Sequence, residues 1–202
     1  MADFDYSRRS ERVRIAHAEL RASFDEMQDR TLVDDPRTIR WEKAVASFHH
    51  ALSLAYPAEL AELEQGERPP SDIATATILD FLEADPVHFG SGYLKEKVLV
   101  EIRRRKLSEP EASRLRSIML QIVNNGDQRR EFRYYCRAAH QLQGEEFREE
   151  LSNLESSEDP KVARRANWML AALEGRFAEI ARASADVRHQ RGDGWISRTG
   201  AR

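Results

Sequence analysis

The sequence predicts an all-α protein built from antiparallel helix pairs that stack side by side. Apolar residues recur at three- and four-residue steps through most of the chain, which is the period of a helix with one buried face. No long alternating run rich in Val, Ile and Thr indicates a strand. Proline and glycine lie mostly between the periodic segments, so the connections are short, and short connections favour antiparallel neighbours.

The composition fits a chain of amphipathic helices. Its 202 residues are 41% apolar and 33% charged, and the net charge is −3. The single cysteine excludes an internal disulfide and favours a reducing compartment. The N-terminal residues carry charges throughout, unlike a secretory signal, and the longest uncharged run, 44–58, is too short to span a bilayer. We therefore expect a cytoplasmic protein without a membrane partner.

The N-terminal segment, residues 1–66, is predicted to hold helices that pack on one end of the stack. The first runs from Ser7 to about residue 30. The second opens at Pro36, because proline suits the first helical position and Asp35 can cap the unpaired amides. Residues 67–70, Glu-Arg-Pro-Pro, indicate a linker.

The core, residues 71–175, alternates two kinds of helix within what we expect to be one structural domain. Ser108 with Glu111 predicts a capping box, and Asp159 before Pro160 predicts another helix start. The predicted first helices are 72–84, 109–124 and 145–156, and the predicted second helices are 91–106, 129–143 and 160–174. Residues 176–202 should add a C-terminal helix and a disordered tail.

The predicted helix 160–174 resembles the second helix of a HEAT repeat. The segment DPKVARRANWMLAALEG matches that pattern at Asp159, Val162, Ala166 and Leu173, with basic residues following the valine. The resemblance covers roughly residues 71–175 and is degenerate. It implies a short, HEAT-like α-solenoid whose second helices line the concave side.

Charge sorts by helix type. The second helices hold 13 basic residues against 4 acids, whereas the first helices hold 10 acids against 3 bases. Arg129, Arg133 and Arg137 lie four residues apart in mid-helix, where the helix dipole does not account for cations. A positive face would attract phosphates or an acidic protein, although solvated structural charge is the competing interpretation. The predicted partner-binding residues are Arg129, Arg130, Arg133, Arg137, Lys97, Arg104, Lys161, Arg165 and Trp168.

No catalytic residue, metal site or cofactor is predicted. Cys136 and His140 lie one helical turn apart and could form a nucleophilic pair. However, Cys136 falls on the apolar face of its helix, which favours a buried and inert thiol. The adjacent His49 and His50 point about 100° apart on a helix and cannot chelate one ion together.

The sequence favours a non-enzymatic helical-repeat module that binds an acidic macromolecule, either a protein or a nucleic acid, through this basic face. One alternative is a nucleic-acid enzyme, because some DNA glycosylases have a HEAT-like fold with a basic concave surface. Another is a structural dimer subunit without a ligand, which a long apolar surface patch would favour.

Overall fold

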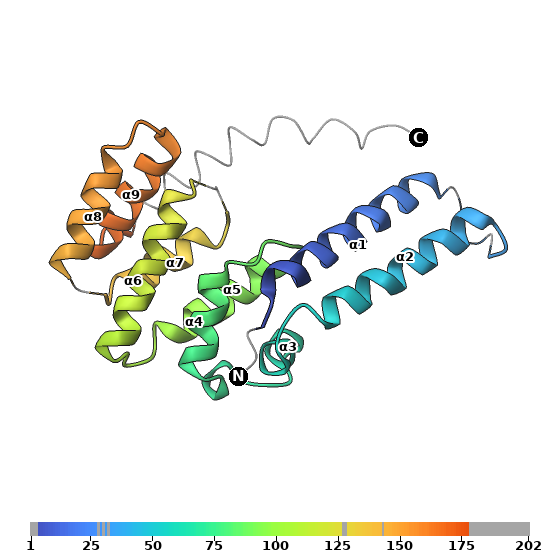
Figure 1. The fold of residues 1–202 in the computed structure, drawn as a ribbon, viewed down its shortest axis with the longest axis horizontal. Coiled ribbons are helices and arrows are strands. Elements are labelled where there is room, and N and C mark those ends of the chain that lie inside the picture. The colour runs from blue at the N-terminus through green and yellow to red at the C-terminus, as the bar shows by residue number, and fades with distance from the viewer. Residues whose placement is uncertain are drawn as a thin grey trace. The chain divides into compact units, whose positions relative to one another are not determined.

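The computed structural model describes residues 4–27, 29, 31, 33–126, 129–142 and 144–177, and all regular structure in these residues is helical (Figure 1). The all-α prediction is therefore confirmed for the described part of the chain. The chain divides into two compact units, Met1–Arg104 and Arg105–Arg202.

The first unit begins with a long antiparallel hairpin of α1 (Tyr6–Glu26) and α2 (Pro36–Ser53), visible in Figure 1. The two helices pack through small and apolar side chains, because residues spaced by three or four share one helical face. Asp35 caps α2 as predicted, accepting a hydrogen bond from the backbone amide of Arg37 at 2.8 Å. The buried side chains include Val13, Ala16, Ser23, Thr38, Ala44 and Phe48.

The remainder of the first unit is centred on α5 (Ser91–Ile102). This helix packs against α3 (Ala58–Gln65), the short 3₁₀ helix η1 (Pro70–Asp72) and α4 (Thr75–Ala84). The predicted linker at 67–70 thus lies inside a compact unit, since the elements on both sides of it pack on α5. The two units divide after α5 instead. The buried apolar residues here include Leu60, Ile73, Ile78, Leu82, Leu94, Val98 and Ile102.

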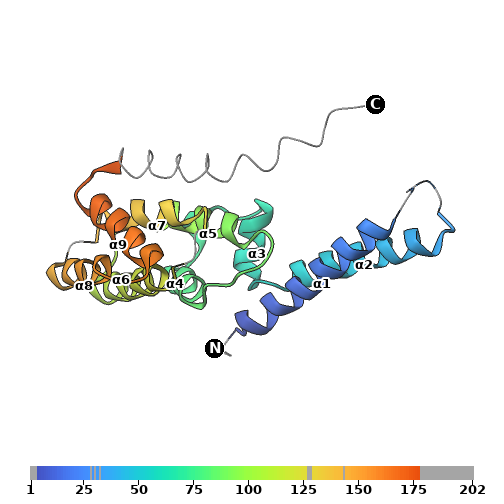
Figure 2. The same ribbon diagram turned by 90° about the horizontal axis from the view of Figure 1, so that it is seen from above.

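The second unit arranges its helices in two layers, as Figure 2 shows. The first layer contains α6 (Glu109–Asn124) and α8 (Glu145–Glu155), and the second contains α7 (Phe132–Ala139) and α9 (Pro160–Leu173). Neighbours pack within each layer and between the layers. The predicted packing of helix pairs therefore holds in this unit. Its buried side chains include Leu115, Met119, Val123, Tyr135, Leu151, Ala166 and Met169.

Two helix starts in the second unit follow their sequence signals. Glu111 accepts from the backbone amide of Ser108 at 2.8 Å, which completes the predicted capping box of α6. Asp159 accepts from the amide of Lys161 at 2.8 Å and caps α9. The predicted tail beyond residue 177 lies outside the described residues.

Candidate binding surface

The helix expected over 129–143 is shorter than the sequence analysis predicted. Arg129 lies before α7, in a turn where the amide of Phe132 donates to the carbonyl of Arg129 at 3.2 Å. Bonds between residues three apart close a tighter turn than the i to i−4 bonds of an α-helix. The expected stripe of three arginines on one helix is therefore wrong, and α7 itself carries Arg133 and Arg137.

These two arginines flank one aromatic ring. The guanidinium carbon of Arg133 lies 5.0 Å from the ring centroid of Tyr134, and that of Arg137 lies 5.5 Å from it. Both distances allow a cation–π attraction. Within the described residues, neither arginine forms an ion pair, and the Nε atom of Arg133 is buried without a hydrogen-bond partner. We call Arg133, Tyr134 and Arg137 the α7 patch.

Other basic side chains lie in the same layer as the α7 patch. Arg130 is exposed in the turn before α7, Arg129 is half-buried there, and Lys161 is exposed on the neighbouring α9. The acid within this segment, Glu131, is only 5% exposed. Helix α8, whose acidic residues include several exposed ones, lies in the other layer of the unit (Figure 2). In the second unit, the acidic helix α8 and the basic helices α7 and α9 therefore lie in different layers.

Two predicted binding residues are directed into the second unit instead. Arg165 is 3% exposed, donates a short hydrogen bond to the carbonyl of Ile122, and places its guanidinium carbon 4.5 Å from the ring centroid of Phe132. Trp168 is half-buried, with its ring 6.2 Å from that of Phe132. Both side chains help to hold α9 on α7, so neither belongs to the α7 patch.

Lys97 and Arg104 belong to the first unit. The ammonium of Lys97 donates to the carbonyls of Leu63 and Glu64, at 3.2 and 3.0 Å, near the C-terminus of α3. This contact matches the preference of cations for helix C-termini. Arg104 is exposed just after α5. The candidate surface is therefore defined by residues of the second unit alone.

Cys136 and His140, the possible nucleophilic pair, each have a structural role. Cys136 is buried, and burial raises the pKa of its thiol to about 12, which suppresses the nucleophilic thiolate. His140 donates from Nδ1 to the carbonyl of Ala172 at 3.0 Å, near the end of α9, and its ring packs edge-on against Phe177. The prediction of a buried Cys136 is confirmed.

The first unit also contains a polar cluster that was not predicted from the sequence. The two ring nitrogens of His88 lie 3.0 Å from the hydroxyl of Ser10 and 2.9 Å from that of Tyr56. Burial, together with the smaller effect of the positive charge on nearby Lys95, lowers the pKa of His88 to about 4. Ser10 and Tyr56 are buried, so this cluster links three segments rather than facing a substrate. A separation of 78 residues between Ser10 and His88 leaves no local signal.

A buried lysine forms a second internal contact that the sequence does not reveal. Lys95 on α5 is fully buried, and its Nζ lies 2.5 Å from a carboxylate oxygen of Asp85. Asp85 itself ends α4 in the left-handed conformation, with φ of 42°. A charge in this position requires its partner, because an isolated buried ammonium is strongly disfavoured.

The described part of the chain contains no group of three or more His, Cys, Asp or Glu side chains arranged to hold a metal ion. Among the described helices, none combines the length and the apolar character needed to cross a bilayer. No protein-family model, curated protein or solved structure matches this chain.

Proposed function

We propose that this chain is a non-enzymatic helical-repeat module that binds an acidic macromolecule through the α7 patch. The supporting observation is that the guanidinium groups of Arg133 and Arg137 lie over the same Tyr134 ring without an ion-pair partner among the described residues. Two cations this close repel each other, and a bound anion relieves that repulsion. The HEAT-like solenoid remains part of this proposal.

The chemistry of the α7 patch suits carboxylate or phosphate groups. A guanidinium presents a planar fork of N–H donors that matches both anions, and an aromatic ring beside it restricts its orientation. Because the ring already restricts the arginine side chains, less conformational entropy is lost when the partner binds. Arg130, in the turn before α7, and Lys161, on α9, are also exposed and would extend the electrostatic attraction.

A glycosylase-type enzyme is the less supported alternative. Such chemistry at this surface would need an accessible carboxylate beside the basic side chains. Of the nearby acids, Glu131 is buried, and exposed Asp159 is engaged as the cap of α9. We therefore base the experiment on binding and include a duplex DNA as one of the ligands.

The test measures binding of the full chain to heparin, to a labelled DNA duplex and to a labelled polyglutamate peptide over a salt series. We expect salt-sensitive binding to at least one ligand, and loss of that binding in Arg137→Glu. For a DNA ligand, each lost phosphate contact should reduce the salt slope by about 1. Arg14→Glu is the matched control, since Arg14 is exposed on α1 and undergoes the same charge change.

Two results would contradict the proposal. One is a parent protein that binds none of the three ligands at low salt. The other is an Arg137→Glu variant that binds as tightly as the parent, or no more weakly than Arg14→Glu. In each case the α7 patch would be solvated structural charge.

A further inference from the structure

An apolar groove of about 500 Å³ runs along one flank of the α1/α2 hairpin. At one end of it, Phe24 is 47% exposed. Further along the hairpin, Phe89 is 56% exposed, and its ring packs edge-on against Phe48 at 5.6 Å between centroids. Exposed apolar side chains in and beside a groove mark an interaction surface. The groove is lined by Leu20, Arg21, Phe24, Asp25, Trp41, Val45, Phe48 and His49.

The hairpin has little other apolar support. Among the described elements, α2 packs mainly on α1, and α1 has only a small additional contact with α4. Two helices bury only the strip between them, whereas a four-helix bundle buries a wider apolar face of each helix. Covering the groove would therefore stabilise the hairpin.

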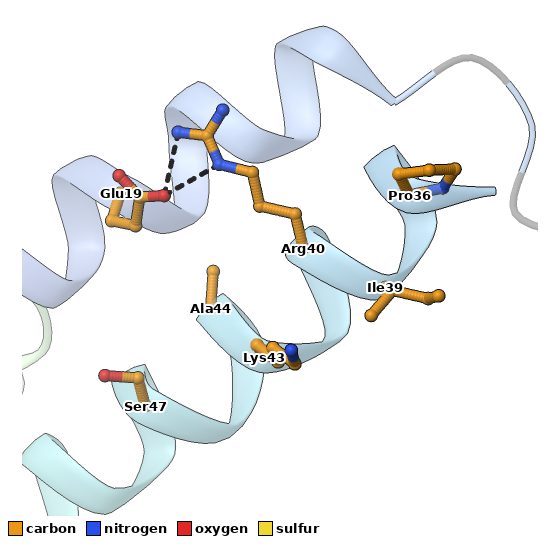
Figure 3. Close-up of a pocket in the computed structure, with 7 residues that line it drawn as sticks. All are labelled: Glu19, Pro36, Ile39, Arg40, Lys43, Ala44 and Ser47. Carbon is orange, nitrogen blue, oxygen red and sulfur yellow. Dashed lines mark hydrogen bonds and ion pairs between the residues drawn. The ribbon is translucent and has the colours of Figure 1, made fainter. Parts of the chain in front are cut away.

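The opposite flank of the hairpin holds another open pocket, of about 520 Å³, and ion pairs cross it. As Figure 3 shows, Arg40 reaches across from α2 to Glu19 on α1, with donor–acceptor distances of 2.9 and 3.0 Å. The same guanidinium also contacts Glu26 at 2.5 Å. These bridges join the two helices directly and pair Arg40, whereas Arg21 and Asp25 on the groove flank form no ion pair within the described residues.

We propose that this groove binds the same groove of a second copy of the chain, so that two hairpins form an antiparallel four-helix bundle. The choice of occupant rests on charge. Arg21 and Asp25 both line the groove, lie one turn apart on α1, and form no ion pair within the described residues. A cation and an anion at this spacing make a pattern that complements itself when the helix direction is reversed.

The geometry of a two-fold pair follows from this spacing. If the axis crosses α1 near residue 23, antiparallel α1 helices place Arg21 of each copy opposite Asp25 of the other. Phe24 then lies close to the axis and enters the groove of the second copy, where Trp41 and Val45 form part of the wall. An aromatic anchor near the centre with charged pairs at its rim is the usual anatomy of a stable interface.

The experiment reverses the charges at residues 21 and 25, one at a time and together. It measures the molar mass of the full chain by sedimentation equilibrium at micromolar concentrations. We expect a dimer for the parent, and at least about tenfold weaker association for Arg21→Asp and for Asp25→Arg when each is tested alone. An equimolar mixture of these two variants should recover association as a heterodimer, because opposite charges face each other at both positions. The double variant carrying both substitutions should also recover it.

Ile15→Ser provides the matched control. Ile15 is exposed and shares a helical face with Glu19 on the opposite flank, so this substitution should leave the dimer intact. A monomeric parent would overturn the proposal. So would a dimer that Ile15→Ser dissociates, or one that the charge variants leave unchanged, or a mixture that fails to recover association. Binding to heparin, DNA or polyglutamate should be unaffected by these variants, which separates this inference from the function proposed for the α7 patch.

Discussion

Replacing Arg165 with methionine should destabilise the second unit. The substitution keeps most of the apolar stem but removes the guanidinium that donates to the carbonyl of Ile122 and lies over Phe132. A hydrogen bond from a charged donor contributes about 1.5–3 kcal/mol, and a desolvated cation–π contact adds about 0.5–2 kcal/mol. Since methionine packing offsets part of this loss, we expect a decrease of about 2–4 kcal/mol in the free energy of unfolding.

Cys136 provides a probe that is specific for this unit. It is the only cysteine in the chain and it is buried, so a thiol reagent modifies it only after local or global opening. When reclosing is faster than modification, the labelling rate follows the equilibrium population of the open state. A loss of 2–4 kcal/mol should therefore accelerate labelling by about 30- to 1,000-fold.

Arg137→Met is the matched control for this experiment. Arg137 is exposed on α7, and its guanidinium contacts the half-buried ring of Tyr134. The rate at which Cys136 is labelled in this variant should therefore stay within about threefold of the rate in the parent. If Arg165→Met labels no faster than Arg137→Met, Arg165 does not hold α9 to its neighbours. Our explanation for its burial would then be wrong.

Three further predictions concern the buried polar groups. Cys136→Ser should lower the free energy of unfolding by about 1–3 kcal/mol in urea titrations, because a hydroxyl replaces a thiol in an apolar site. His88 has a folded-state pKa of about 4, below its usual 6.5, so the unfolded chain takes up the proton first. The contribution of His88 to the free energy of unfolding should be complete above pH 7 and should decline as the pH falls from 6.5 towards 4. The variant His88→Gln should lose this part of the pH dependence. A stability–pH profile equal to that of the parent would contradict the assignment. Lys95→Met should destabilise the first unit by about 3–5 kcal/mol because it removes the buried ammonium that pairs with Asp85, and a melting temperature equal to the parent's would refute this.

Local signals were reliable where the physical cause is local. An aspartate before a proline marks a helix start because its carboxylate reaches an amide only two residues away, as at Asp35 and Asp159. The burial of Cys136 was equally predictable, since its neighbours at helical spacing are apolar. The start of α7 was missed because the periodicity of the arginines continues through a turn that is not α-helical.

The candidate surface could be predicted only in part. Arg133 and Arg137 were identified as candidates, and the structure places both beside Tyr134. The prediction that Arg165 and Trp168 belong to the same surface was wrong. The sequence does not distinguish a helical residue that faces solvent from one that faces a neighbouring helix. The apolar groove of the hairpin was not recognised, since Phe24 and Trp41 fit a buried helical stripe equally well.

The sequence by itself determined the helical class, most helix boundaries and the alternation of acidic and basic helices, because periodicity, capping and charge act over a few residues. Tertiary structure alone decided which charged side chains are structural. Packing of α9 against α6 and α7 turns Arg165 into an internal donor, and packing of α5 buries Lys95 against Asp85. These roles depend on contacts between residues distant in sequence, where desolvation makes a paired charge tolerable and an unpaired one costly.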